Sequence, residues 1–135
     1  MMKMNQLVLM VGPLIYSLFF AVLFLQSGLD KCFDFKGNLA WLEPHFSKTF
    51  FARFVRQLLI LLTCFELASG LSFLLAVPAI LMGSFNFFFI ARALAGITLL
   101  FLFTGQRLAK DYAGASTIAI YFGVWFLAFF GFFGL

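Results

Sequence analysis

Two ionisable side chains lie inside long apolar stretches, where a charge is costly. Glu66 falls in the run 54–76 and Arg92 in the run 80–103. Each lies about 12 residues into its run, which is ~18 Å at helical rise. A carboxylate or guanidinium at that depth requires a partner, a polar cavity or a ligand to offset its desolvation. Because an arginine and a carboxylate can form a planar, two-pronged hydrogen bond, we predict that Glu66 and Arg92 face one another or share a polar cavity.

Both residues share a helical stripe with small or hydroxyl side chains, which let helix backbones approach closely. These neighbours are Thr63 and Gly70 for Glu66, and Ala95 and Gly96 for Arg92. Two interpretations of the predicted pair stay open. It is either a packing ion pair without a ligand, or part of a cavity that binds a substrate, a quinone or a proton.

The composition identifies the class of protein that carries this pair. Hydrophobic residues make up 64% of the 135 residues, 23 residues are phenylalanine, and only 10% are charged. Soluble domains have about 25% charged residues. We therefore predict an all-α integral membrane protein with a single domain over residues 1–135, whose first partner is the lipid bilayer.

Hydropathy predicts four spans joined as a four-helix bundle, at about residues 7–27, 54–76, 80–103 and 116–133. Gly28 is expected to end the first span, and Pro78 the second. Between the first two spans, Phe35, Leu39, Leu42 and Phe46 recur at helical spacing, which predicts an interfacial amphipathic helix interrupted or kinked at Pro44.

Basic residues favour one orientation of these spans. The two polar connections share a face, and the opposite face carries only Lys3 and the amino terminus; the connections contain Lys31, Lys36, Lys48, Arg53, Arg56, Arg107 and Lys110. By the positive-inside rule, we expect the connections in the cytoplasm and both termini on the other side. Because the net charge of +4 is spread over these flanking segments, no nucleic-acid partner is expected.

Other chemistry-bearing residues are few. His45 is the single histidine, and Cys32 and Cys64 lie too far apart in the sequence for a CxxC motif. No spacing typical of a metal site, a haem ligand pair or a phosphate-binding loop occurs, so we expect no metal and no cofactor.

Three segments resemble the DoxX family of small bacterial inner-membrane proteins. They are Gly28-Leu-Asp-Lys31, Phe65-Glu-Leu-Ala-Ser-Gly70 and Gly105-Gln-Arg-Leu-Ala-Lys-Asp-Tyr-Ala-Gly114. The resemblance implies a four-helix bundle in the bacterial inner membrane, with periplasmic termini under the charge bias above. It also implies an association with quinone-linked oxidases or thiosulfate-oxidising complexes, and it marks Lys31 and Glu66 as family-like charged residues without an assigned catalytic role.

We therefore expect a non-catalytic accessory subunit of a larger membrane complex, such as one of the respiratory chain, which is not an enzyme on its own. Two alternatives stay open. One is a binding or carrier protein for a small lipophilic molecule such as a quinone, and the other is the membrane subunit of a quinone-linked oxidoreductase.

Overall fold

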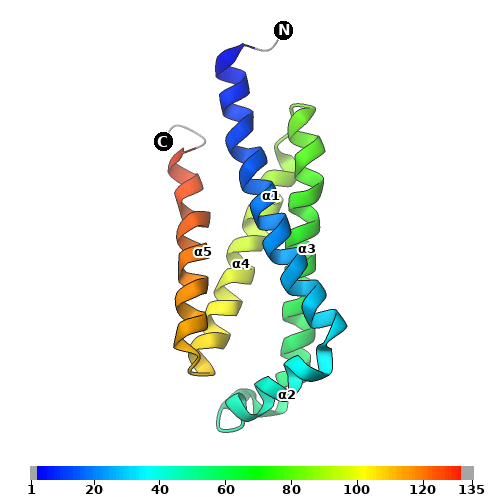
Figure 1. Cartoon of the computed structure of the whole chain (residues 1–135), viewed down its shortest axis with the longest axis vertical. Helices are drawn as coiled ribbons and strands as arrows, with labels where there is room; N and C mark the ends of the chain where they lie inside the picture. Colours follow the sequence, from blue (N-terminus) through cyan, green and yellow to red (C-terminus); the bar gives the residue numbers. More distant parts are fainter. Residues whose placement is uncertain (1–2, 132–135) are drawn as a thin grey trace.

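Every regular element in the part of the chain described by the computed structural model is a helix. The structure describes residues 3–131, with side chains up to residue 128. The elements are α1 (Met4–Phe33), α2 (Phe35–Phe46), the short 3-10 helix η1 (Phe50–Arg53), α3 (Val55–Leu81), α4 (Asn86–Leu108) and α5 (Tyr112–Gly131) (Figure 1). Helices α1, α3 and α4 are long and apolar enough to cross a membrane, and α5 is a shorter apolar helix.

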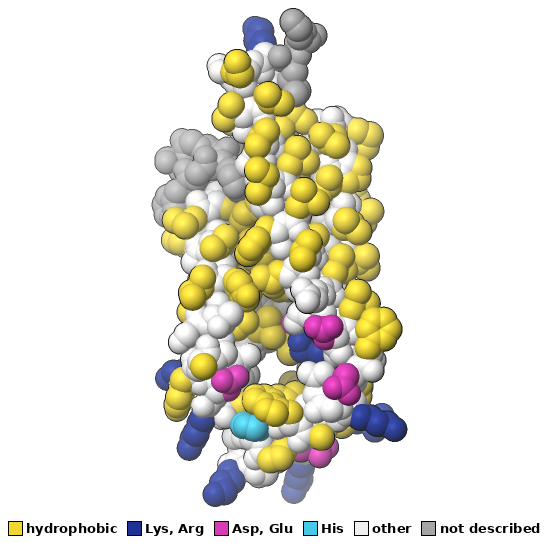
Figure 2. All heavy atoms as spheres, in the orientation of Figure 1, with side chains coloured by type: hydrophobic (Ala, Val, Ile, Leu, Met, Phe, Trp, Pro, Cys, Tyr) yellow, Lys and Arg dark blue, Asp and Glu magenta, His cyan; other side chains and the backbone are white. Residues whose placement is uncertain are grey.

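The long helices follow one another as antiparallel neighbours. Helix α1 packs most extensively on α3, α3 on α4, and α4 on α5, while α2 crosses one end of the molecule (Figure 1). The connection that contains α2 and the turn between α4 and α5 lie at this same end. Lysine and arginine side chains gather there (Figure 2). The two polar connections therefore share a face, as the sequence predicts.

The ends of the helices differ from the predicted bounds of the spans. Helix α1 continues through Gly28 to Phe33, and α3 continues through Pro78 to Leu81. A proline inside a helix removes one backbone hydrogen bond, whereas ending the helix in apolar surroundings would leave several groups without partners. As a result α4 begins at Asn86 rather than near Ile80. The predicted end of the fourth span, residue 133, lies outside the described residues.

The turn between α3 and α4 forms at Gly83 instead of at Pro78. Gly83 has a φ of +86°, a left-handed conformation that glycine adopts without a Cβ penalty. Its N–H donates to the Ile80 carbonyl at 2.9 Å, and the Ser84 N–H donates to the Ala79 carbonyl at 2.8 Å. This Schellman-type pairing satisfies the last carbonyls of α3.

The helix predicted between the first two spans is confirmed as α2. The Asp34 side chain accepts from the Gly37 N–H at 3.2 Å and caps its start. The helix runs past Pro44 to Phe46, so Pro44 does not interrupt it, and the alternative of a kink at Pro44 stays a prediction. Phe46 is buried against Val55 and Ala109. Helix α2 therefore closes one end of the space between α3 and α4.

Candidate functional site

Glu66 forms a buried ion pair with Lys31. The Lys31 Nζ lies 3.0 Å from Oε2 and 3.2 Å from Oε1 of Glu66. Ser27, one turn before Lys31 on α1, donates its hydroxyl to Glu66 Oε1 at 2.7 Å and accepts from Lys31 Nζ at 2.9 Å. Glu66 is 0% exposed and Lys31 16%. The three side chains form a closed network in which the carboxylate is neutralised and hydrogen-bonded.

A close approach between α1 and α3 brings these side chains together. A Cβ built on Gly28 would lie 2.7 Å from Leu67 Cδ2, and one built on Gly70 would lie 2.7 Å from Leu25 Cγ. Each glycine thus receives a leucine of the opposite helix. Gly28 follows Ser27 directly, and Gly70 lies one turn after Glu66. The two contacts fix the separation at which Ser27 and Lys31 reach Glu66.

The predicted contact between Glu66 and Arg92 is wrong, although both residues are buried. Glu66 lies 15 residues before the end of α3 at Leu81, whereas Arg92 lies 6 residues after the start of α4 at Asn86. An offset of about nine residues separates them by ~13 Å along the helix axes. The observed register pairs Ser69 with Thr98 through their hydroxyls at 3.0 Å. The error arises from placing the turn at Pro78.

Arg92 belongs to a second buried polar region, formed by α1, α4 and α5. Its guanidinium lies 5.6 Å from the centre of the Phe88 ring and interacts electrostatically with Tyr16. Its backbone carbonyl accepts a hydrogen bond from Trp125 Nε1 at 2.8 Å. Trp125 also packs closely against Gly96, because a Cβ built on Gly96 would lie 2.6 Å from Trp125 Cζ2. Arg92 therefore links three helices away from the Glu66 site.

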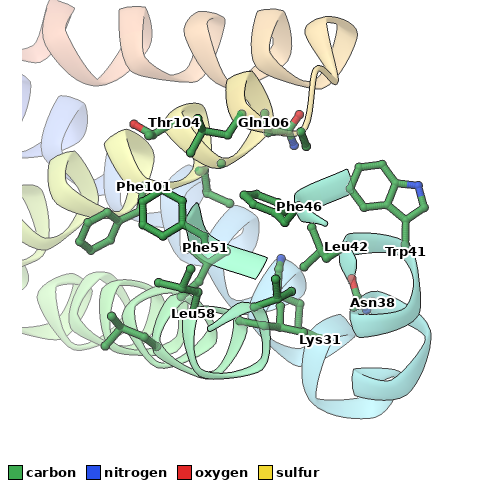
Figure 3. A pocket seen from close by; sticks show the side chains of 18 residues that line it. Lys31, Asn38, Trp41, Leu42, Phe46, Phe51, Leu58, Phe101, Thr104 and Gln106 are labelled. Atoms are coloured by element: carbon green, nitrogen blue, oxygen red, sulfur yellow. The ribbon is translucent and has the colours of Figure 1, made fainter. Parts of the chain in front are cut away.

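A cavity of about 410 Å³ lies beside the Lys31 network, between α2, η1, α3 and α4 (Figure 3). Most of its lining is apolar and includes Leu42, Phe46, Phe51, Leu58, Leu62 and Phe101. Lys31 points its ammonium into this pocket (Figure 3). Asn38, Thr104 and Gln106 are its uncharged polar members, and Lys31 is the only charged one among the described residues. The pocket thus combines a mostly apolar lining with one ammonium group.

A second, more open hollow lies between α1, α4 and α5, next to the pocket. In Figure 2 it opens between α1 and α5 above α2. Lys31, Leu102 and Gln106 line both the hollow and the pocket. These three residues therefore form the partition between the two spaces.

Gln106 was not identified as a site residue from the sequence. Its amide packs against Gly114, where a Cβ would collide with the Gln106 and Asp111 side chains. The backbone N–H of Asp111 donates to the Gln106 carbonyl at 2.9 Å, as part of the turn that follows α4, in which Lys110 has a φ of 58°. The available signal was the polar sequence around Gln106 between Gly105 and Gly114, which contains both turn and cap residues.

Of the three residues singled out from the sequence, the structure brings Lys31 and Glu66 together and places Arg92 elsewhere. No group of histidine, cysteine and acidic side chains within residues 3–128 could hold a metal ion. The resemblance to the DoxX family stays a prediction, because comparison with protein-family models, curated proteins and solved structures finds no match to this chain.

Proposed function

We propose that this protein is a DoxX-like four-helix membrane protein that binds a small lipophilic molecule with a polar head group, such as a quinone. The observation that carries the proposal is the mostly apolar pocket of about 410 Å³ with the Lys31 ammonium in its lining. Ligand sites of this size are mostly apolar, with a few polar groups that fix the orientation of the ligand.

The walls of the pocket fit the tail of such a molecule. Leu58 and Leu61 line it and are 37% and 47% exposed on the outer surface of α3. In a membrane this surface faces the acyl chains, so the pocket opens towards lipid. A lipophilic molecule can enter from the bilayer without crossing water, which favours ligands already dissolved in the membrane.

The membrane placement is part of the same proposal. Helix α5 serves as the fourth span beside α1, α3 and α4. The end with α2 carries the gathered lysine and arginine side chains, so it faces the cytoplasm of a bacterial cell and the termini face the periplasm. The pocket then lies near the cytoplasmic surface of the inner membrane.

Filling the pocket at Gly105 is expected to abolish ligand binding without harming the fold. Gly105 lines the pocket, and a Cβ there meets no atom within 4 Å. The leucine side chain in Gly105→Leu therefore fills part of the space in the pocket that the ligand needs. Binding of decylubiquinone is measured by quenching of Trp41, which also lines the pocket. We expect the specific quenching of Trp41 to fall about tenfold or more in Gly105→Leu, because the ligand loses the volume in which it binds.

Gly123→Leu is the matched control, because Gly123 also has open space at its Cβ but lines neither the pocket nor the hollow. It should bind as the unsubstituted protein does. Trp41→Phe identifies the quenched fluorophore, since the only other tryptophan, Trp125, lies beside Arg92. Equal quenching of Trp41 in Gly105→Leu and Gly123→Leu would refute ligand binding in the pocket.

The second candidate function is that of an accessory subunit in a larger membrane complex, such as a respiratory complex. The observation that favours it is the hollow between α1 and α5, whose apolar members include Leu18, Val22, Ile118 and Tyr121. Side chains of a partner's transmembrane helix can fill such a space.

If the protein is an accessory subunit, a partner should co-purify with it from native membranes in mild detergent. We expect mass spectrometry to identify that partner, and Val22→Trp, which occupies the hollow, to release it. Val22 is 65% exposed, so the substitution should leave the fold intact. Purification of the protein alone under these conditions would exclude the accessory role.

A further inference from the structure

We propose that the pocket selects molecules whose head group is uncharged and accepts hydrogen bonds, and that it excludes anionic lipids and fatty acids. The inference rests on the proposed function, because it specifies the chemical class of the ligand that the pocket binds.

The charge of Lys31 is already neutralised before a ligand arrives. Its Nζ lies 3.0 Å and 3.2 Å from the two carboxylate oxygens of Glu66. Glu66 itself does not line the pocket. A head group beside Lys31 therefore meets an ammonium that already has its counter-ion, so the net charge of the pair is zero.

An anionic head group would place a second negative charge around this one ammonium. The pocket lining offers it no other cation among the described residues. Glu66 cannot move aside at low cost, because it is fully buried and its other hydrogen-bond donor is Ser27 alone. A buried carboxylate that loses its cation is strongly destabilising. The anion would therefore gain little attraction and would still lose its hydration.

A neutral acceptor meets no such repulsion. The ammonium carries three N–H donors and already contacts both Glu66 oxygens and, on Ser27, the hydroxyl and the carbonyl, the last at 3.4 Å. A ligand oxygen therefore takes the place of a Ser27 contact, while the ion pair with Glu66 is retained. The Gln106 amide, which lies in the same partition, supplies a further polar contact without charge. In a molecule that has a carbonyl, sulfonyl or ester oxygen on an apolar tail, the tail contacts the apolar lining of the pocket and the oxygen accepts a hydrogen bond.

Two nearly isosteric probes separate these cases. Dodecyl methyl sulfone is neutral and accepts hydrogen bonds, whereas dodecanesulfonate carries a permanent negative charge on the same chain. Calorimetric titration of each compound into the protein in phosphatidylcholine nanodiscs gives two dissociation constants. The Gly105→Leu variant is the control, because its pocket is filled and the heat measured with it comes from partitioning of the compound into lipid. We expect the sulfone to bind about tenfold more tightly than the sulfonate.

Glu66→Gln removes the counter-ion and retains the shape of the side chain. The preference should then fall by about tenfold or reverse, because Lys31 becomes an uncompensated cation. Asp30→Asn is the matched control, since Asp30 is an exposed carboxylate next to Lys31 in sequence and does not line the pocket. It should retain the original preference.

The possible failures are distinguishable. If neither compound gives more heat than it does with Gly105→Leu, both the proposed function and the inference are overturned. If the sulfonate binds the unsubstituted protein as tightly as the sulfone, the pocket binds lipophilic molecules but the inference of charge selection is wrong. The same holds if Glu66→Gln leaves the preference unchanged.

Discussion

Lys31→Met is expected to destabilise the protein by ~3–5 kcal/mol, the cost of leaving one member of a buried ion pair without the other. Glu66 is 0% exposed, and without the ammonium it retains only the Ser27 hydroxyl as a donor. Glu66→Gln should cost less, about 1–3 kcal/mol, because the amide still accepts from Ser27 and Lys31 remains in contact with the pocket. The measurement is unfolding in detergent, followed by circular dichroism.

The double variant Lys31→Met/Glu66→Gln tests whether the two effects share one cause. It should be more stable than Lys31→Met alone, with a coupling of about 1–3 kcal/mol, because no uncompensated charge remains. Lys36→Met is the control, since Lys36 is an exposed lysine on α2, and it should change the stability by less than about 0.5 kcal/mol. Additive effects in the double variant would show that the ion pair does not contribute to the stability.

The sequence predicted the buried carboxylate but assigned it the wrong cation. An acid within an apolar span is visible from hydropathy, and so Glu66 was identified as a site residue. Its partner depends on the register between helices. Lys31 lies two residues from the end of α1, in a segment that the sequence assigned to the polar connection, and it reaches Glu66 only because α1 continues to Phe33.

The order of the helices could also be predicted from hydropathy. Apolar runs of this length in a chain with few charges leave little choice but successive helices. The turns were less predictable, because a proline and a glycine compete as helix ends near residues 78–83. The helix follows the glycine, where a left-handed backbone lets the last carbonyls of α3 be paired. This difference of a few residues moved Arg92 away from Glu66.

Gly70→Ala is expected to destabilise the protein by ~1–3 kcal/mol, the usual cost of overpacking a close contact. The added Cβ would lie 2.7 Å from Leu25 Cγ and 2.9 Å from the Leu25 backbone nitrogen. A side chain can rotate away, but the backbone nitrogen can retreat only if α1 moves. That movement should also draw Ser27 and Lys31 away from Glu66, so Gly70→Ala and Glu66→Gln should show non-additive losses in thermal unfolding.

Gly28→Ala provides the matched comparison, because its closest contacts are Leu67 Cδ2 and Cγ, while the Leu67 backbone nitrogen is 3.4 Å away. Shortening that leucine with Leu67→Ala should relieve the Gly28→Ala clash, whereas Leu25→Ala should leave most of the Gly70→Ala loss in place. Gly123→Ala, where nothing lies within 4 Å of the added Cβ, should be neutral or stabilise by up to about 1 kcal/mol through helix propensity. Full rescue of Gly70→Ala by Leu25→Ala would mean that side-chain crowding, rather than the approach of the two backbones, sets the distance between α1 and α3.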